Sequence, residues 1–440
     1  MFYHLSLPSL TLAVQMASTL IDHFLRHEEG SVIIQFAPVV EASETFDAVS
    51  RRQLVRSLKR HARDSQRDTR QLLQKLNIPA KSYWIDNSLH IPKLNRSMLA
   101  VINGHVNTVA EEIRLDGKIA EIRYKNVIKI PKQSEINPHH LDQLNVKQAW
   151  TRTRGSSNVI VATIDTGVDY THPDLVKSFT GYGWMDIVSA REKQTKPFDP
   201  HGHGTHTMGT IVGRLTGTAP GVRWMTARAC TEDGCLQSDL TAAAQFVLCG
   251  GDYVKCERGA NVVSNSWGAT SADGMTWFRP IGIVWQRAGI TAVFAAGNSG
   301  PGCGTIYSPA SDRNVLSVGA VTVSNRVCSF SSRMSGVDNG DHAHVIKPDV
   351  VAPGLNVVST WPGGGYARVS GTSMACPQVA GIMALMVSLK NSTSSPFNLM
   401  RVMKESANHT IIKPDKCCLD GKCAYGWGLV DAHMAIMSLD

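Results

Sequence analysis

The sequence lacks the features that mark several large classes of protein. It has no run of eighteen apolar residues, which argues against a membrane-spanning helix. It has no internal repeat and no low-complexity tract, and its 43% hydrophobic and 18% charged residues are near globular averages. This composition excludes a largely disordered, collagen-like or coiled-coil chain. At 440 residues, we expect one large and one small domain.

Cysteine is absent from the first 229 residues and then occurs ten times. The close pairs Cys230/Cys235 and Cys249/Cys256 suit short disulfide loops better than zinc, whose ligands usually come as two tight pairs. We therefore expect disulfide bonds and a secreted, extracellular protein. Cys376 lies in a small-residue segment, where a buried thiol packs as a small hydrophobe. Because nine cysteines then remain, at least two thiols should be free.

The N-terminus has little of what a secretion signal needs. Leu5 to Leu20 is moderately apolar, but it lacks a basic n-region and a clean small-x-small cleavage site. We interpret residues 1–30 as a weak signal peptide or leader, and a misassigned start is the alternative. Three glycosylation sequons agree with a secreted eukaryotic glycoprotein. They lie at Asn95, Asn391 and Asn408.

The positive charge is unevenly placed. Residues 1–132 carry 19 Lys+Arg against 13 Asp+Glu, whereas the remainder carries 25 against 23. Nine of the basic residues fall between Arg51 and Lys75, in a segment whose pattern indicates one helix. We interpret this stretch as a solvated helix face, and a nucleic-acid or membrane surface is the alternative. We expect no nucleic-acid and no membrane partner.

The N-terminal part of the chain has the pattern of a small α+β open sandwich of sheet and helices, over residues 31–131. Pro131 ends its last apolar stretch. Residues 132–140 then turn polar and predict a processing linker. The expected elements are strands at 31–36 and 83–91, helices at 47–77 and 96–113, and one or two further strands within 119–130.

Residues 141–440 show short, continuous apolar strands, each followed by a small-residue turn and a helical stretch. Strands that are buried on both faces have this pattern, so we predict a doubly wound α/β domain, a mostly parallel sheet with helices on both faces. Ligands of such sheets bind beyond the carboxyl ends of the strands. The strands are expected at 159–165, 223–230, 260–268, 290–298 and 314–321.

Asp165 ends the first of these strands, and Gly167 lets the chain turn immediately. A carboxylate at this point can orient a base. The same Asp-Thr-Gly triplet also occurs in aspartic proteases and in ordinary strand-ending turns. An aspartic protease needs one triplet in each of two lobes, and this sequence has only one.

Three histidines, His201, His203 and His206, fall within six residues at the start of a small-residue helix. They mimic the H-x-H-x-D-H pattern of metallo-hydrolases, but Thr205 stands in place of the acidic residue. We therefore favour one imidazole as a general base over a metal site, since an unperturbed imidazole titrates at about pH 6.5.

Ser373 begins a small-residue helix, where backbone N–H groups point at the position of a developing oxyanion. A plain N-cap serine is the alternative. The G-x-S-x-G elbow of α/β-hydrolases fails at Ala375, and that fold places its acid and histidine after the serine. Asn298 ends an apolar strand between glycines, and its amide can donate to the same oxyanion or simply stabilise a turn.

The order Asp165, His203, Asn298, Ser373 closely resembles the subtilisin-like serine proteases. The resemblance spans about 140–440 and is carried by the strings DTGVDYTHPDL, HGTH, SNSWG, AAGNSG and GTSMACP. SNSWG and a short loop after the histidine helix make the chain most similar to the bacillopeptidase F branch. Residues 31–131 resemble the inhibitor-type propeptide of these enzymes, with weaker motif support.

This resemblance implies a secreted serine endopeptidase, made as a self-processing zymogen, that acts through an Asp-His-Ser triad and an acyl-enzyme. Ser373 is the implied nucleophile, His203 the base and Asp165 its orienting acid, and Asn298 is an oxyanion donor. Uncharged pocket walls predict a preference for apolar or aromatic residues before the scissile bond. The implied substrate-binding residues are Ser266, Trp267, Gly268 and Tyr307.

The sequence departs from the family pattern at a few positions. Gln378 stands where the family usually has histidine, outside the triad, so we expect no loss of activity. The stretch 208–220 is shorter than in subtilisin and lacks the loop that completes its calcium site, of which Asp174 matches one ligand. We therefore expect no cofactor and no metal, since calcium is not supported.

The expected partners are protein or peptide substrates and the chain's own propeptide, and we expect a monomer. A catalytically dead relative that acts as a binding module is the main rival hypothesis. We disfavour it because every position that the chemistry needs is filled.

Overall fold

The computed structural model describes residues 15–16, 18–38, 50–106, 110–120, 122, 125–130, 136–189, 196–270, 277–334, 346–389, 395–410 and 422–439. Internal contacts divide the chain into two compact units. The first comprises Met1–Glu41 and Val55–Gly117, and the second comprises Ala42–Leu54 and Lys118–Asp440. The predicted linker 132–140 falls partly outside the described residues.

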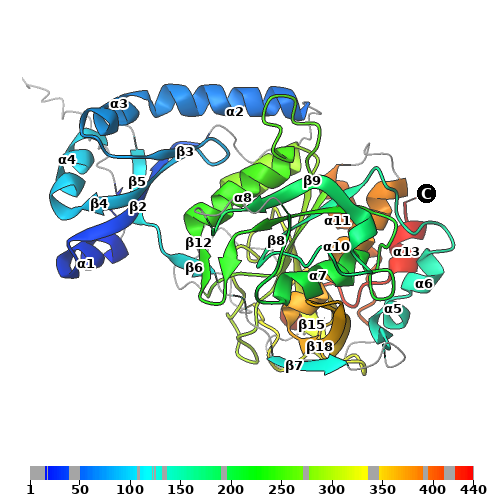
Figure 1. Ribbon diagram of the computed structural model, residues 1–440. Coiled ribbons are helices and arrows are strands. Elements are labelled where there is room, and N and C mark those ends of the chain that lie inside the picture. Colours follow the sequence, from blue (N-terminus) through cyan, green and yellow to red (C-terminus); the bar gives the residue numbers. More distant parts are fainter. Residues whose placement is uncertain are drawn as a thin grey trace, which may run out of the picture. The chain divides into compact units, whose positions relative to one another are not determined.

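The first unit is built on a five-stranded sheet with the strand order β1-β5-β2-β4-β3 (Figure 1). Alternate residues of β2, Val32, Ile34 and Phe36, form a core with Leu99 and Ile102 of α4. Ile33 and Gln35, which point to the opposite face of the strand, are also buried, so β2 is covered on both faces from Val32 onward. The elements are β1 (Gln15–Met16), α1 (Ser18–Arg26), β2 (Glu29–Phe36), α2 (Arg51–Ser65), α3 (Arg67–Lys75), β3 (Lys81–Tyr83), β4 (Ser88–Asn95), α4 (Arg96–Val106) and β5 (Ala110–Leu115).

Three predicted boundaries in this unit were wrong. The helix expected at 47–77 is two helices where it is described, separated at the buried Gln66, whose side chain bonds Ser82 and Asn87. The helix expected at 96–113 ends at Val106, because β5 pairs with β2 instead. The strand expected at 83–91 is a hairpin, β3 with β4. In each case tertiary contacts override the local pattern.

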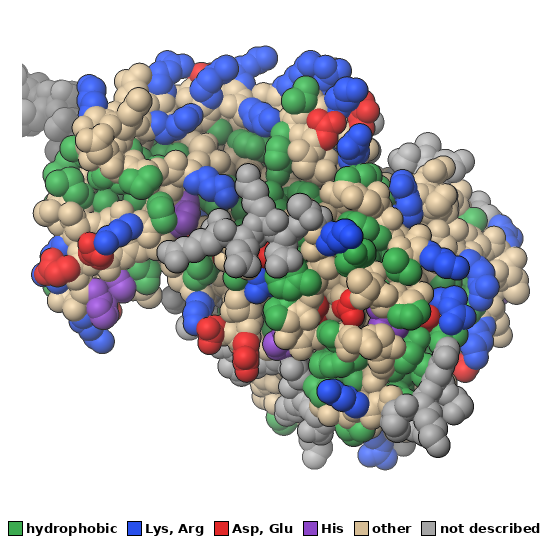
Figure 2. Space-filling view, in the orientation of Figure 1, with side chains coloured by type: hydrophobic (Ala, Val, Ile, Leu, Met, Phe, Trp, Pro, Cys, Tyr) green, Lys and Arg blue, Asp and Glu red, His purple; other side chains and the backbone are tan. Residues whose placement is uncertain are grey.

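Helix α2 is strongly amphipathic. Its buried side chains are Leu54, Val55, Leu58 and Ala62, a spacing that places them on one face. Figure 2 shows Lys and Arg side chains gathered along the region of α2 and α3. Apart from Arg51, the basic residues thus lie mainly on the solvated face of the two helices. Arg51, which belongs to the second unit by its contacts, donates to the Ala260 and Ala288 carbonyl oxygens at 2.6 and 2.7 Å.

The second unit is built on a seven-stranded parallel sheet with the order β16-β15-β14-β13-β8-β10-β9. Every residue of β8, an interior strand of this sheet, is buried, as expected for a strand covered on both faces. Helices α7 and α10 contact each other, as do α8 and α9, and both pairs contact sheet strands. The predicted α/β class and the five predicted strands are confirmed. The strands are β8 (Ile160–Asp165), β9 (Phe179–Asp186), β10 (Arg223–Arg228), β13 (Val262–Asn265), β14 (Thr291–Ala295), β15 (Leu316–Val321) and β16 (Val350–Pro353).

Helix α10 (Thr372–Leu389) is the central packing helix of this unit. It is the one described helix whose length and hydropathy would suit a membrane span, and 89% of its apolar window is buried inside the protein. Val379, Ile382 and Leu385 pack into the same core as Val161 of β8 and Val293 of β14.

Two small sheets complete the second unit, β11-β12-β6 and β17-β18-β7. The stretch 119–130 was expected to extend the sheet of the N-terminal unit, but its strands β6 and β7 pair antiparallel with β12 and β18. The strands are β6 (Lys118–Ala120), β7 (Lys125–Ile130), β11 (Cys230–Thr231), β12 (Gly234–Leu236), β17 (Val357–Trp361) and β18 (Gly365–Ser370). The helices are α5 (His139–Gln143), α6 (Val146–Ala149), α7 (His203–Val212), α8 (Gln237–Cys249), α9 (Arg279–Arg287), α11 (Pro396–Glu405), α12 (Lys422–Tyr425) and α13 (Ala432–Met437), with a 3-10 turn at Val176–Ser178.

Candidate active site

The candidate residues meet at one edge of the parallel sheet. Asp165 is the last residue of β8, Ser266 follows β13, and Asn298 follows β14. Because the strands are parallel, their carboxyl ends lie at the same edge. Two helices begin there: His203 is the first residue of α7 and Ser373 the second residue of α10.

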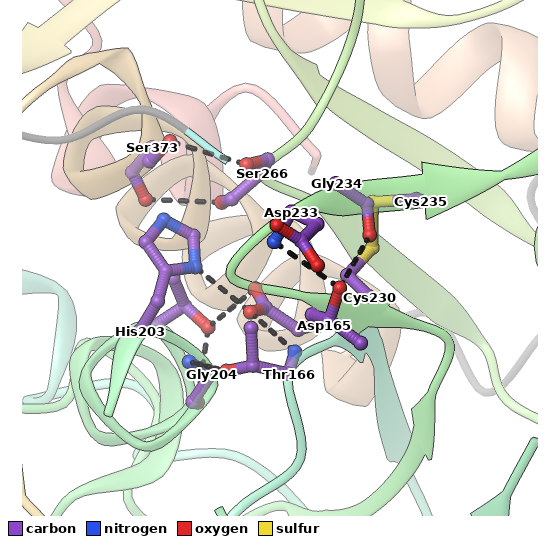
Figure 3. The surroundings of a disulfide bond; sticks show 12 residues. Asp165, Thr166, His203, Gly204, Cys230, Asp233, Gly234, Cys235, Ser266 and Ser373 are labelled. Carbon is purple, nitrogen blue, oxygen red and sulfur yellow. Dashed lines mark hydrogen bonds and ion pairs between the residues drawn. A yellow bond between two sulfur atoms is a disulfide. The ribbon is translucent and has the colours of Figure 1, made fainter. Parts of the chain in front are cut away.

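Asp165 and His203 form a buried pair. Nδ1 of His203 lies 2.8 Å from Oδ1 of Asp165, and each residue is 1% exposed. Since an ionised carboxylate can only accept, Nδ1 carries the hydrogen and a neutral ring keeps Nε2 as the proton acceptor. Figure 3 shows the ring of His203 between Asp165 and Ser373.

The carboxylate of Asp165 is itself held by its neighbours. The Thr166 backbone N–H donates to Oδ1 at 2.7 Å, and the Thr207 hydroxyl donates to Oδ2 at 3.3 Å. Two glycines let α7 approach this turn closely. A Cβ on Gly204 would lie 2.1 Å from the Gly167 carbonyl oxygen, so a larger residue would push the helix away from Asp165.

Asp199 anchors the start of α7, a role that sequence reasoning missed. One of its carboxylate oxygens accepts from the Gly202 N–H at 2.9 Å, and the other accepts from the Thr205 N–H at 2.8 Å. The Thr166 hydroxyl donates to the same carboxylate at 2.9 Å and accepts from the Gly204 N–H at 3.0 Å. An acid four residues before the helix that satisfies its first N–H groups was the available signal.

Ser373 and Ser266 make reciprocal hydrogen bonds. The Ser373 hydroxyl donates to the Ser266 carbonyl oxygen at 3.1 Å, and the Ser266 hydroxyl donates to the Ser373 carbonyl oxygen at 3.0 Å. The start of α10 is thereby tied to the segment that follows β13. Ser373 is 2% exposed and stands on a helix that is buried along most of its length.

Asn298 is oriented by Thr372. Its Oδ1 accepts from the Thr372 backbone N–H at 2.9 Å and from the Thr372 hydroxyl at 3.0 Å. Two donors on one amide oxygen identify that atom as the oxygen, which turns the NH₂ group away from Thr372. Thr372 is a second residue whose role the sequence did not reveal.

A small pocket opens beside Ser373. Ser266, Trp267, Gly268 and Tyr307, the four predicted substrate-binding residues, line it together with Asn298. Ala295, Gly297, Thr372 and Ser373 complete the lining, which contains no charged side chain. The Tyr307 hydroxyl lies 2.9 Å from the Ser299 hydroxyl oxygen.

The three clustered histidines do not converge on a common point. His203 faces Asp165, whereas Nε2 of His206 bonds the Val357 and Ala367 carbonyl oxygens at 3.1 and 3.2 Å. Burial, reinforced by the nearby His203, lowers the pKa of His206 to about 3. Within the described ranges, no group of three or more His, Cys, Asp or Glu side chains is arranged to hold a metal ion.

Asp174, which matches one ligand of the family's calcium site, and Gln378, which departs from the family pattern, both have protein partners. Asp174 lies 3.4 Å from the Arg214 Nε and accepts from the Leu215 N–H at 3.1 Å. Gln378 donates to the carbonyl oxygens of Pro353 and Met374 at 2.7 and 2.8 Å.

The cysteine predictions hold for the described residues. Disulfide bonds join Cys230 to Cys235 and Cys249 to Cys256. Cys376 is free and buried, as predicted, and Cys328 is a second free, buried thiol. Burial raises the pKa of the Cys376 thiol to about 12, so it is an inert packing group despite its closeness to Ser373.

A parallel α/β sheet that brings Asp, His and Ser together in this chain order defines the subtilisin-like class of proteins. The Subtilase family model matches residues 156–428, and the chain belongs to this family. Bacillopeptidase F from Bacillus subtilis (strain 168) is 28% identical over 97% of this chain and 32% of its own length. The similarity to the bacillopeptidase F branch is thus confirmed.

Two further relatives match the larger part of the chain. A thermophilic serine proteinase from Bacillus sp. (strain AK1) is 38% identical over 54% of this chain and 55% of its own length. Subtilisin BL from Lederbergia lenta is 33% identical over 68% of this chain and 98% of its own length. The chain therefore spans about a third of bacillopeptidase F and about half of the thermophilic proteinase.

Proposed function

We propose that this protein is a serine endopeptidase with Asp165, His203 and Ser373 as its triad. The observation that carries the proposal is the buried 2.8 Å contact between Asp165 and His203 beside the pocket that Ser373 lines. Ser373 Oγ attacks the peptide carbonyl, and His203 takes its proton and returns it to the leaving amine. The resulting acyl-enzyme is hydrolysed by water, which His203 activates in turn.

The Ser373 backbone N–H and the Asn298 side-chain NH₂ hold the oxyanion of each tetrahedral intermediate. Thr372 fixes the amide oxygen of Asn298, so the donor is in place before the reaction begins. Asp165 keeps the imidazole in its useful tautomer and stabilises the imidazolium that forms.

Hydrolysis of casein, with and without a serine-directed covalent reagent, tests this function. We expect proteolysis that the reagent abolishes and a single covalent label on Ser373. Ser373→Ala should be inactive although folded. A folded wild-type chain that neither hydrolyses casein nor accepts the label would instead support the inactive binding module.

The pocket supports a preference for a large apolar or aromatic residue before the scissile bond. Its lining has no acid to receive Arg or Lys, and Tyr307, Trp267 and Gly268 offer neutral walls. A peptide library should therefore be cleaved mainly after Phe, Tyr, Leu or Met. Cleavage mainly after basic residues would contradict this assignment.

We also infer that the N-terminal part is an inhibitor-type propeptide that the enzyme removes itself. The antiparallel pairing of Lys118–Ala120 with β12 supports this role, because it adds a strand beside the candidate triad as an extended substrate would. Wild-type protein should yield a fragment of about 300 residues that begins between residues 131 and 140. Ser373→Ala should fold and stay full length.

Intact mass and N-terminal sequencing in a protease-deficient host compare the two forms. Cleavage of purified Ser373→Ala at that junction would rule out self-processing. A mature N-terminus between residues 121 and 124 would be consistent with self-processing, but it would place the cut before β7 in the sequence instead of after it. Full activity with the N-terminal part still covalently attached would exclude the inhibitor role.

Secretion and glycosylation belong to the same proposal. The disulfides support an oxidising compartment. Asn95 and Asn408 are exposed, whereas Asn391 lies outside the described residues. Expression through a eukaryotic secretory pathway should give protein whose mass falls on treatment with a glycosidase that removes N-linked sugars.

A further inference from the structure

The hairpin of β11 and β12 is closed by a disulfide between directly paired residues. In its antiparallel register Cys230 lies opposite Cys235 and Thr231 lies opposite Gly234. These two residue pairs are the whole ladder of the hairpin. A hairpin this short is marginal without further support, so the covalent bond is a major constraint on its shape.

The two halves of the hairpin have different surroundings. Cys230 follows β10, where Arg228 pairs with Asp165 and the Ala229 N–H donates to the Asp165 carbonyl oxygen at 3.0 Å. The first half is therefore fixed to the strand that ends at the triad. β12 instead stands between β11 and β6 in the three-stranded sheet.

β12 is the strand of this hairpin that receives an added chain segment. Leu236 pairs with Lys118, and Cys235 pairs with Ala120, both antiparallel. Figure 3 shows the Cys230–Cys235 bond on the same side of the site as Asp165, with Ser373 on the opposite side of the view. The disulfide thus joins a backbone anchored at Asp165 to a backbone that pairs with an incoming strand.

We propose that the Cys230–Cys235 disulfide positions substrate: it holds β12 in the geometry that pairs with the residues of an extended peptide before the scissile bond. Cys230 and Cys235 are positioning residues in this account, because they touch neither the reacting atoms nor the pocket that holds the residue at the cut. The inference rests on the proposed endopeptidase function and goes beyond it. It predicts that the bond contributes to binding of long substrates and contributes little to the chemical step.

The second disulfide provides a matched control. Cys249–Cys256 lies at the opposite end of α8, a helix of 13 residues that begins directly after β12. At 1.5 Å per residue this separates the two bonds by about 20 Å. The loops they close are similar, with sequence separations of 5 and 7, so both bonds constrain the unfolded chain to a similar degree.

The test compares two double variants of the full chain after activation, Cys230→Ala/Cys235→Ala and Cys249→Ala/Cys256→Ala. Each is assayed on a peptide amide with four residues before the scissile bond and on a single-residue ester that does not reach β12. We expect the first variant to raise KM for the long peptide about tenfold, the loss of one or two backbone hydrogen bonds. Its kcat, and both constants for the ester, should stay within twofold of wild type. The control should match wild type on both substrates.

Equal losses on the peptide and the ester would overturn the inference, because they would show a general collapse of the site. An unchanged KM for the long peptide would overturn it as well. If the alanine pair does not fold, Cys230→Val/Cys235→Val fills the same space with a cross-strand β-branched pair. Failure of both pairs to fold would make the disulfide a folding requirement and refute the positioning role. A wild-type chain that is inactive on both substrates would count against the proposed function instead.

Discussion

Thr372 and Asn298 show how a residue next to the nucleophile can act through another residue. Thr372 precedes Ser373 in the sequence, yet its hydroxyl and backbone N–H both point to the amide oxygen of Asn298. The hydroxyl also accepts from the Gly297 N–H at 3.3 Å. Thr372 therefore holds both the side chain of Asn298, the proposed oxyanion donor, and the backbone of the preceding Gly297.

We expect Thr372→Val, which removes the hydroxyl but keeps the shape, to lower kcat about tenfold with little change in KM. Asn298→Ala should lower kcat by about 10²–10³, the effect of removing one oxyanion donor in a subtilisin. Because Thr372 acts through Asn298, the double variant should be no slower than Asn298→Ala alone. Steady-state kinetics on one peptide amide measures all three. Multiplicative losses would show that Thr372 has a separate role.

At the scale of elements, α7 is placed by a carboxylate that lies outside it. The helix begins at His203 after Gly202, whose φ of +101° is in the left-handed region. No side chain caps the helix from that position, and Asp199 satisfies the free N–H groups instead. The same carboxylate holds Thr166, which follows Asp165. A single side chain thereby fixes the segments that carry both His203, the proposed base, and Asp165, its proposed orienting acid.

Asp199→Asn should lower kcat/KM by about 10–100-fold, because an amide presents an N–H to at least one of these donors and displaces His203. The midpoint temperature of thermal unfolding should fall by a few degrees, because losing the cap removes about 1 kcal/mol of stability. Asp431→Asn is the matched control: Asp431 caps α13 by accepting from the Met434 N–H at 2.9 Å. It should lose similar stability and keep its kinetic constants. Equal kinetic losses in both variants would contradict the positioning of His203 by Asp199.

At the scale of the whole molecule, buried histidines make stability depend on pH. Nε2 of His140 donates to the Thr216 carbonyl oxygen, 2.9 Å away, and the residue is fully buried. Burial is the main reason that the pKa of His140 falls to about 4. The hydrogen bond to the Thr216 carbonyl raises the pKa, His139 lowers it further, and Asp142 raises it. A carbonyl only accepts, so Nε2 carries the hydrogen in the neutral ring.

Because these pKa values are lowered by folding, acid destabilises the folded protein. The unfolded chain takes up protons at about pH 6.5, whereas folded His140 and His206 do so only near their pKa values of about 4 and about 3. The stability that the two buried neutral rings contribute is fully present above about pH 6.5. It is lost as the pH falls from there towards the folded pKa values, and for His140 the loss is about 3 kcal/mol.

The midpoint temperature of thermal unfolding of full-length Ser373→Ala should therefore decrease as the pH falls from about 6.5 to 4. His140→Gln should flatten this dependence, whereas His409→Gln, at an exposed position, should leave it unchanged. Parallel pH profiles for all three proteins would show that His140 does not supply the effect.

Much of the α/β unit could be predicted because its signals are local. Continuous apolar strands such as 160–165 and 291–295 are buried on both faces, and the residues that follow them must meet at one sheet edge. That rule predicted Asp165 and Asn298 as candidate residues, whereas Ser266 was implied by the resemblance to subtilisin-like proteases. The free thiol at Cys376 followed from its small-residue helix in the same way.

The features that could not be predicted depend on contacts between residues far apart in the chain. Local periodicity favoured a helix to residue 113, but pairing of Ile113 with Ile34 made it a strand. The sequence by itself determined the α/β class and its main strands, and it predicted the candidate residues at the strand ends, because these depend on residue type and on a short-range period. Only the tertiary structure decided that Asp199 holds α7, that Thr372 orients Asn298, and that the Cys230–Cys235 bond lies close to Asp165, because these contacts are set by packing.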